Sequence, residues 1–415
     1  MKKFKTEPKI INIEDTNTTI IKIMFFNKHT KEDTIKNRIM NRILRTCNNL
    51  YRTPKEFETK REDLLIMNLS IDTNAYIENE VTYVTMTLPR EGIIDEFNLE
   101  ECIKFLHDTL YNPYIENNEF NNEHFNWERD FVLDRERNFP NNIYETLEEE
   151  TIKILNEIDD VYITHEEFMN FINKQTPKTI YEHYINRIKN NNFITYIYGN
   201  IENKEKILNT FNKYFKQNKE EIEVDNKYNR YFKLTEYKEF KKETKYNQTI
   251  LDLIYQIKDL KTEEKTMLDT LFYFLNAQEN DLIFQNLRVK NNLVYNSRVM
   301  ENTTCGIINI VAFLNKEDIK KAQEIIEETL EDIKKEENFN IYKERLLKAL
   351  KYDVLTEEDN DYNIVKDIIN KDIKEEKTLK EKYEKIKEIT SKDMNNFIDR
   401  LKLTRKLTMV GDTNE

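Results

Sequence analysis

The segment Thr19-Ile20-Ile21-Lys22-Ile23-Met24-Phe25-Phe26 recurs 230 positions later as Thr249-Ile250-Leu251-Asp252-Leu253-Ile254-Tyr255-Gln256. Each copy is an alternating run rich in β-branched and aromatic residues, which predicts a strand. A polar break and a helical pattern follow each copy, beginning near Lys31 and near Lys261. The repeat therefore indicates two halves built on the same plan.

Two further repeats support this duplication. Residues 163–172 match residues 389–398, and in both copies a threonine, Thr164 or Thr390, precedes an apolar helical pattern that it can cap. Each copy then ends in a short strand that is closed by a glycine, first at 199 and then at 411. Because the first strand, the late helix and the final strand recur in the same order, we predict an α+β fold of two homologous halves.

Each half is predicted to be one antiparallel sheet that is covered by helices on one face. The predicted domains are residues 1–217 as the N-terminal half, 218–246 as a linker with the first edge strand of the second half, and 247–415 as the C-terminal half. In the first half, the expected elements are a strand at 17–27, helices at 31–46 and 54–69, strands at 71–78 and 81–89, helices between 97 and 187 and a strand at 193–199. In the second half, they are a strand at 247–257, helices within 262–289, strands at 293–299 and 306–314, helices between 316 and 399 and a strand at 405–410.

The composition excludes several classes of function. The chain of 415 residues has 65 Lys and Arg against 78 Asp and Glu, a net charge of −13, and it has no concentrated basic stripe, so nucleic acid is not an expected partner. With four glycines, it cannot form the glycine-rich loops that bind phosphates. Cys47, Cys102 and Cys305 are widely spaced and odd in number, which indicates reduced, mostly buried thiols. Neither Cys47 nor Cys305 has a nearby histidine that would make it a nucleophile.

No segment has the pattern of a membrane span or a signal peptide. Residues 1–26 are interrupted by Glu7, Glu14 and Asp15, and no later apolar run approaches the ~20 residues that cross a bilayer. We therefore expect a cytoplasmic protein without membrane association.

The histidines cannot form a helical zinc motif. No two of them are three, four or five positions apart, so neither H-x-x-E-H nor H-E-x-x-H occurs. His29 is expected in a turn, and the i, i+4 pair of His124 and Glu128 is expected to be a solvated surface contact. The charge-dense segments 316–337 and 371–388 are interpreted as solvated helix faces. The five histidines are His29, His107, His124, His165 and His183.

Two local motifs carry a resemblance. The first is Asn280-Asp281-Leu282-Ile283-Phe284-Gln285-Asn286-Leu287-Arg288-Val289-Lys290-Asn291-Asn292-Leu293-Val294-Tyr295, and the second runs from Tyr111-Asn112-Pro113 to Phe120 and on to Phe125-Asn126-Trp127-Glu128-Arg129. With the element order and the duplication, they resemble the pitrilysin/insulinase family of zinc peptidases, which includes the mitochondrial processing peptidases and bacterial two-subunit relatives. The resemblance covers essentially the whole chain and implies a duplicated pitrilysin-type fold, although only the segment from Arg288 to Tyr295 is specific.

The resemblance implies a catalytic role for Arg288 and Tyr295. In the family, the arginine and tyrosine of L-F-x-x-L-R-x-K-x-x-L-x-Y are aimed at the substrate carbonyl opposite the zinc, where a guanidinium and an O–H can stabilise an oxyanion. Their spacing of seven alone is not informative, because Arg137 and Tyr144 share it. The context is informative, since a helix ends near Arg288 and Tyr295 opens an apolar strand. The alternative is a surface arginine and a half-buried strand tyrosine.

The chain also departs from the family. Catalytic members carry H-x-x-E-H on the helix after the first strand, which here reads Asn37-Arg38-Ile39-Met40-Asn41. The third ligand, a glutamate, would come from the helix at 124–137, where the best register places Arg135, with Glu136 beside it. A single carboxylate cannot hold zinc tightly. No metal ligand or other cofactor is therefore expected in this chain, and zinc is expected in a partner.

The sequence thus favours the non-zinc subunit of a heterodimeric zinc metalloendopeptidase. Its partner would be a homologous chain with H-x-x-E-H, to whose active site this chain would supply Arg288 and Tyr295 and part of a peptide-binding chamber. The chain would be inactive alone, and a small peptide or a leader peptide is the expected substrate. The alternative is a catalytically inactive scaffold or peptide-binding protein of the same fold.

Overall fold

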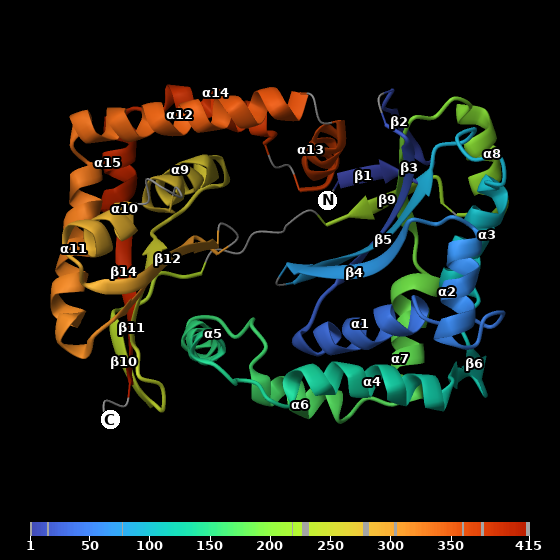
Figure 1. The fold of residues 1–415 in the computed structure, drawn as a ribbon, viewed down its shortest axis with the longest axis horizontal. Coiled ribbons are helices and arrows are strands. Elements are labelled where there is room, and N and C mark those ends of the chain that lie inside the picture. Colours follow the sequence, from blue (N-terminus) through green and yellow to red (C-terminus); the bar gives the residue numbers. More distant parts are fainter. Residues whose placement is uncertain are drawn as a thin grey trace. The chain divides into compact units, whose positions relative to one another are not determined.

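The computed structural model describes residues 2–14, 16–76, 78–217, 219–225, 232–276, 282–302, 305–358, 361–374 and 377–411. The chain divides into two compact units, and each has its own sheet and hydrophobic core (Figure 1). Within the described ranges, no helix combines the length and the apolar character that a membrane span requires. Unit 1 consists of residues 1–141 and 161–228, and unit 2 consists of residues 142–160 and 229–415.

Unit 1 is built on a mixed five-stranded sheet in the order β2-β8-β3-β5-β4. The central strand β3 contains the first copy of the repeated segment and pairs antiparallel with both β5 and β8. The edge strand β2 pairs parallel with β8. The strands of this sheet are β2 (Lys9–Asn12), β3 (Thr18–Lys28), β4 (Asn68–Tyr76), β5 (Asn79–Pro89) and β8 (Phe193–Gly199), and two small ribbons pair β1 (Lys2–Lys5) with β9 (Glu221–Val224) and β6 (Ile115–Glu116) with β7 (Glu119–Phe120).

Helices of unit 1 bury one face of this sheet. Alternate residues of β3, namely Ile21, Ile23 and Phe25, point into the core that the helices close, as the period of a strand requires. The helices are α1 (Lys31–Leu44), α2 (Pro54–Asp63), α3 (Leu99–Tyr111), α4 (Asn122–Glu136), α6 (His165–Ile172), α7 (Pro177–Tyr184), which continues into the π-helical turn η1 (Ile185–Lys189), and α8 (Lys204–Tyr214).

Unit 2 repeats this plan with a mixed five-stranded sheet in the order β10-β14-β11-β13-β12. The central strand β11 contains the second copy of the repeated segment, pairs antiparallel with β13 and β14, and is buried at every position. The edge strand β10 pairs parallel with β14, as β2 does with β8. The strands are β10 (Lys238–Thr244), β11 (Thr249–Ile257), β12 (Val294–Asn302), β13 (Ile307–Leu314) and β14 (Leu401–Gly411).

The core of unit 2 lies between one face of its sheet and a layer of helices. Leu251, Leu253 and Tyr255 of β11 line this core, and α11 and α15 run beside the sheet (Figure 1). The helical segments are η2 (Thr262–Glu264), α9 (Lys265–Asn276), α10 (Leu282–Phe284), the π-helical turn η4 (Gln285–Lys290), η5 (Lys316–Asp318), α11 (Ile319–Ile333), α12 (Glu336–Glu358), α13 (Asp361–Lys374), α14 (Leu379–Glu388) and α15 (Ser391–Asp399).

The helix α5 (Ile143–Asn156) is part of unit 2, although it lies within the predicted N-terminal half. It contacts the face of the sheet that α11 and α15 leave uncovered (Figure 1). The Thr151 hydroxyl donates to Asp252 Oδ2 at 3.0 Å, and the Tyr144 ring lies 5.2 Å from the Phe313 ring. The sheet of unit 2 therefore carries helices on both faces, whereas helices on one face were expected.

The residues of β11 and β13 explain this second layer. Because side chains alternate along a strand, Ile250, Ile254 and Val311 point away from the main helical core, and all three are buried. Water contact at such positions would cost about 25 cal/mol per Å² of apolar surface. A helix from another part of the chain removes some of this cost.

Local signals in the repeats have the roles expected for them. The Thr164 and Thr390 hydroxyls accept hydrogen bonds from the backbone N–H groups of Glu167 and Asp393, so both threonines cap helices as predicted. At Gly199, where φ is +134°, a Cβ would come within 2.1 Å of the Thr18 carbonyl oxygen.

The second closing glycine has the same steric origin. At Gly411, a Cβ would lie 2.5 Å from the Tyr246 carbonyl oxygen. Both closing strands thus end in glycine because neighbouring backbone leaves no room for a side chain.

The α+β class, the two-fold repeat and most strands agree with the sequence-based expectation. The parallel pairing of β2 and β10 was not expected. The helix predicted at 54–69 ends at Asp63, because Leu65 adopts a left-handed φ of +59° and Asn68 begins β4. The linker residues 226–231 and the first two positions of the motif at 280–295 lie outside the described residues.

Candidate functional site

The helix α1 carries Asn37, Met40 and Asn41 at the positions of the expected zinc motif. Met40 is fully buried in the core of unit 1, so its position offers no side chain to a metal or a water molecule. Both polar atoms of the Asn37 amide have a partner, because Nδ2 donates to Glu80 Oε2 at 2.7 Å and Oδ1 lies 2.8 Å from His183 Nε2. These positions contain no imidazole and no carboxylate.

Asn41 and the helix α4 complete this region. Asn41 is buried and donates from Nδ2 to Thr73 Oγ1 at 3.0 Å, and its Oδ1 has no hydrogen-bond partner among the described residues. On α4, Glu136 Oε1 accepts from Arg38 Nη1 at 3.1 Å, and Arg135 is exposed. One carboxylate that is already engaged by an arginine does not fit a zinc ion.

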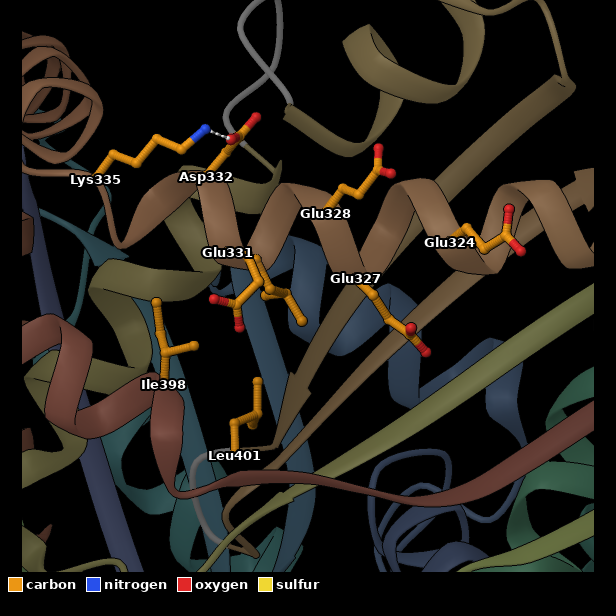
Figure 2. Close-up of a pocket in the computed structure, with 9 residues that line it drawn as sticks. Glu324, Glu327, Glu328, Glu331, Asp332, Lys335, Ile398 and Leu401 are labelled. Carbon is orange, nitrogen blue, oxygen red and sulfur yellow. Dashed lines mark hydrogen bonds and ion pairs between the residues drawn. The ribbon is translucent and has the colours of Figure 1, made fainter.

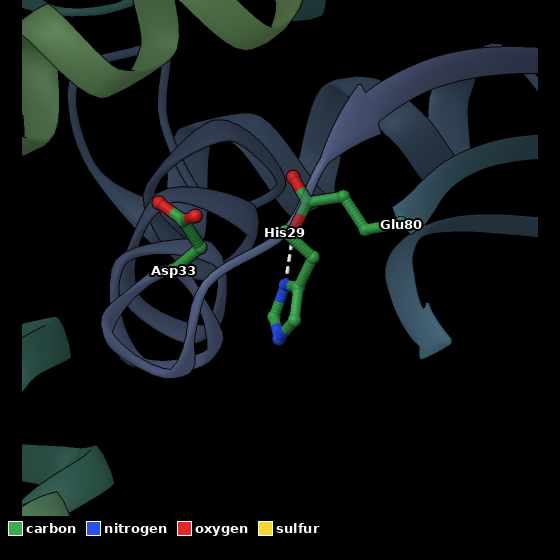
Figure 3. A group of neighbouring side chains, drawn as sticks. All are labelled: His29, Asp33 and Glu80. Atoms are coloured by element: carbon green, nitrogen blue, oxygen red, sulfur yellow. Dashed lines mark hydrogen bonds and ion pairs between the residues drawn. The ribbon is translucent and has the colours of Figure 1, made fainter. Parts of the chain in front are cut away.

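Three other possible metal ligands lie close together around the start of α1. His29, Asp33 and Glu80 offer ligand atoms within 4.8 Å of one another, and Figure 3 shows them at the start of α1 and on β5. His29 Nδ1 lies 2.7 Å from Glu80 Oε2, the oxygen that also accepts from Asn37. His29 was expected to be a turn residue, and it does follow β3, but its ring is also part of this buried network.

A guanidinium supplies the positive charge that this cluster needs. Arg187 lies with Nη2 at 2.9 Å from Asp33 Oδ2 and Nη1 at 3.5 Å from Glu80 Oε1, and it also donates to the Lys28 carbonyl. Burial raises the pKa of Asp33, but hydrogen bonds from Thr30 and the charge of Arg187 outweigh it and hold that pKa below its ordinary value. Arg187 therefore balances part of the negative charge of this buried cluster.

His183 belongs to the same network in its neutral form. Burial, followed by the charge of Arg187, lowers the pKa of His183 to about 3, although Asp33 acts in the opposite direction. A neutral imidazole can form the hydrogen bond to Asn37 Oδ1 that the geometry shows. The network thus fixes the amide of Asn37 at the first position of the expected motif.

Arg288 lies in unit 2 on the π-helical turn η4, directly before β12. Its Nη1 donates to Asn292 Oδ1 at 2.9 Å and to the Val294 carbonyl oxygen at 3.0 Å. Asn292 adopts a left-handed φ of +50°, which asparagine tolerates better than most residues, and this residue turns the chain from η4 into the strand. π-Helical turns are frequent at functional sites.

Tyr295 lies near the start of β12 with 55% of its surface exposed. Its hydroxyl donates to Asn315 Oδ1 at 2.8 Å. Arg288 and Tyr295 are therefore joined through the backbone at Val294, and no direct hydrogen bond links their side chains in the described structure. The two predicted site residues lie on one short, solvent-accessible segment of unit 2.

The prediction of a surface contact for His124 and Glu128 was wrong. Both side chains are buried where α4 packs against α1, with His124 Nε2 3.7 Å from Glu128 Oε1. The Thr46 hydroxyl lies 2.8 Å from that nitrogen and 2.9 Å from that oxygen, and Arg42 Nε is 2.6 Å from Glu128 Oε2. The sequence shows that the pair shares one helix face but not that α1 covers this face.

The three cysteines are buried and form no disulfide, and burial raises the pKa values of both Cys47 and Cys102 to about 12. Neither thiol is activated as a nucleophile, as expected for Cys47.

A pocket of about 780 Å³ in unit 2 is lined mainly by carboxylates of α11. Figure 2 shows these side chains along the helix, with Ile398 and Leu401 below it in this view. The opposite side of α11 is apolar and faces the core. The acidic side therefore agrees with the expected solvated helix face. Its carboxylates are Glu324, Glu327, Glu328, Glu331 and Asp332.

Two groups of charged residues in unit 1 were not predicted from the sequence. Arg187 could not be recognised, because Asp33 and Glu80 are remote from it in sequence. Arg38, Arg42 and Arg45, in contrast, have the i, i+4, i+7 spacing of a single helix face and could have been found.

Comparison with known proteins identifies a family signature and a shared fold. Residues 174–346, which include both Arg288 and Tyr295, match the family model of the peptidase M16 inactive domain. No curated protein matches the sequence.

The fold of the whole chain is similar to three bacterial crystal structures. A conserved protein from Enterococcus faecalis V583 has a TM-score of 0.83 at 16% identity, covering 100% of this chain and 99% of that one. A protease from Helicobacter pylori has a TM-score of 0.73 at 14% sequence identity, and the match covers 98% of each chain. A peptidase M16 inactive domain from Pseudomonas fluorescens has a TM-score of 0.70 at 12% sequence identity, and the match covers 99% of this chain and 98% of that one. The family model confirms the predicted resemblance to an inactive form of a peptidase family, and the solved structures show the shared fold.

Proposed function

Residues 174–346 carry the signature of the peptidase M16 inactive domain, and on this premise we propose that the chain is the non-zinc subunit of a heterodimeric zinc endopeptidase. Its partner is a homologous chain that carries H-x-x-E-H and the zinc. This chain contributes Arg288, Tyr295 and part of the chamber in which a peptide is cleaved. A short peptide or a leader peptide is the proposed substrate.

One contrast carries the proposal. The zinc positions have been lost, since Met40 is part of the core and the Asn37 amide is fixed by buried partners. Arg288 and Tyr295 remain on an accessible segment at the start of β12. A pair of donors that stays accessible where the zinc positions are gone supports a role at a partner's active site.

The geometry suits these two residues to the proposed role. The Arg288 guanidinium is held by Asn292 and Val294 through Nη1, so its orientation is set before a substrate arrives, and Nε and Nη2 remain able to donate. Preorganised donors stabilise a developing oxyanion without reorganising at the moment of reaction. Tyr295 has one O–H, which must leave Asn315 before it can donate to the substrate.

Reconstitution tests the proposal. The purified chain is mixed with an H-x-x-E-H chain encoded beside it, and the mixture is analysed by size-exclusion chromatography with light scattering and by cleavage of a fluorogenic peptide library. We expect a 1:1 complex with an interface at least as large as the ~1,600 Å² of a standard complex, and cleavage by the mixture only. Separate elution at micromolar concentration, with no activity beyond that of the metal subunit, would contradict the proposal.

A catalytically inactive scaffold or peptide-binding protein is the second candidate. It is favoured by the internal hydrogen bonds of the pair, because Arg288 stabilises the turn before β12 and the Tyr295 hydroxyl already has Asn315 as its partner. Under this alternative, the 1:1 complex still forms, but substitution of Tyr295 leaves its turnover unchanged.

A further inference from the structure

A pocket of about 640 Å³ occupies the region of unit 1 where the zinc motif is expected. Its walls come from α1, from the edge strand β4 and from the last turns of α4. Asn37 and Asn41 are the buried polar residues of α1 in its lining. The volume is in the range of pockets that bind small ligands or one or two residues of a peptide.

Four arginines line this pocket. Arg38, Arg42 and Arg45 follow one another at i, i+4 and i+7 along α1, and Arg135 comes from α4. The lining carboxylates are those of Asp72 and Glu136. Positive charge is thus concentrated in this pocket of a chain whose net charge is −13.

Two of the arginines are held in place by neighbours. Arg38 pairs with Glu136 at 3.1 Å. Arg42 pairs through Nε with Glu128 at 2.6 Å, and its guanidinium lies 3.6 Å from the centre of the Phe131 ring. Because each of these ion pairs uses few of the five N–H donors of an arginine, donors remain for a ligand.

The other two arginines have no such neighbours. Neither Arg45 nor Arg135 forms a side-chain hydrogen bond or ion pair with any residue that the structure describes. Even when Glu128 behind Arg42 is counted with Asp72 and Glu136, the arginines of the pocket outnumber its carboxylates. The pocket is therefore complementary to an anion.

A second, independent observation indicates which chemical groups the ligand carries. Asn41 is 93% buried, lines the pocket and leaves Oδ1 without a donor in the described structure. An unsatisfied buried acceptor costs about 1–3 kcal/mol, which a ligand N–H or O–H would recover. Phe131, also in the lining, is 46% exposed and offers an apolar surface. A carboxylate meets the positive charge, an N–H group meets Asn41, and an apolar portion of the same ligand would meet Phe131; a peptide with an acidic group has all three.

We propose that this pocket binds a carboxylate of an acidic peptide, through Arg45 and Arg135, with a peptide N–H on Asn41. The planar fork of arginine matches the two oxygens of a carboxylate. The carboxylate belongs either to an Asp or Glu side chain or to the peptide C-terminus. This binding is a property of the chain by itself and does not depend on the proposed peptidase role.

Fluorescence anisotropy with the purified full chain tests this proposal. The probe is a labelled Gly-Ser decapeptide with three central glutamates and an amidated C-terminus. Two matched peptides carry three glutamines instead, one amidated and one with a free C-terminal carboxylate. We expect the glutamate peptide to bind and the amidated glutamine peptide not to bind. Binding of the glutamine peptide with the free terminus would identify the terminal carboxylate as a further ligand.

Variants locate the binding. Arg45→Gln and Arg135→Gln should each weaken binding roughly tenfold, as expected for the loss of one charge-assisted hydrogen bond. Neither side chain has a described partner, so the fold should be unaffected, and this is checked by circular dichroism. The matched control is Arg137→Gln, which removes the same charge two residues further on, from an arginine that pairs with Asp134. Equal binding of the glutamate and amidated glutamine peptides, or an equal loss in Arg137→Gln and Arg135→Gln, would overturn the proposal.

Discussion

Arg288 binds the backbone of Val294, with Nη1 donating to the carbonyl oxygen at 3.0 Å. Val294 directly precedes Tyr295, so the arginine also fixes where the tyrosine leaves the turn. The Tyr295 hydroxyl, in contrast, forms a single hydrogen bond in the described structure, to Asn315. Substitution of the tyrosine therefore tests chemistry with little effect on structure, whereas substitution of the arginine changes both.

Tyr295→Phe should lower kcat of the reconstituted complex roughly 10²–10³-fold, because it removes one donor to the oxyanion while the ring remains. Complex formation and peptide binding should persist. The control is Tyr144→Phe, since Tyr144 has the same spacing from Arg137 and packs its ring on Phe313. Steady-state kinetics on both complexes provide the measurement, and near-normal kcat in Tyr295→Phe would leave the chain as a scaffold.

Arg288→Ala should reduce kcat at least as much as Tyr295→Phe, because a charge is lost with the donors. It should also lower the free energy of unfolding by about 1 kcal/mol, since the bonds to Asn292 and Val294 disappear. Arg288→Lys keeps the charge without the planar fork and should give an intermediate kcat. Kinetics and urea unfolding separate the two effects, and the role in catalysis fails if kcat follows stability alone.

Asp252→Asn should change how the stability of unit 2 depends on pH. Burial raises the pKa of Asp252 to about 7, although hydrogen bonds from Thr151 and Asn309 act against it. In the unfolded chain this carboxyl titrates near ~3.9. Between these two pH values, Asp252 is protonated in the folded state and ionised in the unfolded state. The free energy of unfolding therefore falls as pH rises from about 4 to 7.

The variant cannot ionise and should gain stability relative to the natural chain as pH increases. Thermal melting of both proteins between pH 5 and pH 8 measures the difference. If the melting temperatures of the two proteins differ by the same amount at every pH in this range, the raised pKa of Asp252 is contradicted.

Arg187→Gln should destabilise the chain by about 3–5 kcal/mol, because Asp33 and Glu80 would be left buried without their cation. The control is Arg137→Gln, an exposed arginine whose loss should change stability by less than about 0.5 kcal/mol. Urea unfolding at pH 7 tests the contrast.

The pH dependence of this variant gives a second check. Arg187 is one of the groups that hold the pKa of Asp33 below its ordinary value, so the deficit should shrink as the pH falls and Asp33 takes up a proton in the variant. Equal stability of Arg187→Gln and the natural chain would mean that Arg187 does not balance this network.

The purified chain should retain no stoichiometric zinc after dialysis, since Asn37, Met40 and Asn41 offer no ligand and Glu136 is engaged by Arg38. Mass-spectrometric metal analysis measures this directly. One tightly held zinc per chain would contradict the loss of the site and would direct attention to His29, Asp33 and Glu80.

The sequence by itself was sufficient for features that depend on neighbouring residues. The alternating runs of β3 and β11 predicted strands, Thr164 and Thr390 predicted helix caps, and the duplication predicted two α+β units. The absence of zinc ligands at Asn37, Met40 and Asn41 was also visible, because it depends only on which residue types are present. The spacing and context of Arg288 and Tyr295 were readable for the same reason, although their role is still to be tested.

The tertiary structure decided what depends on remote partners. The helix α5 covers apolar residues of β11 and β13 and contacts the sheet of unit 2 through Thr151 and Asp252, and the edge strands β2 and β10 pair parallel with β8 and β14. Asn37 and His183 meet across 146 residues of sequence. Such contacts arise when hydrophobic burial brings distant segments together, and only then do Arg187 balance Asp33 and Glu80, and Arg135 join Arg45 in one pocket.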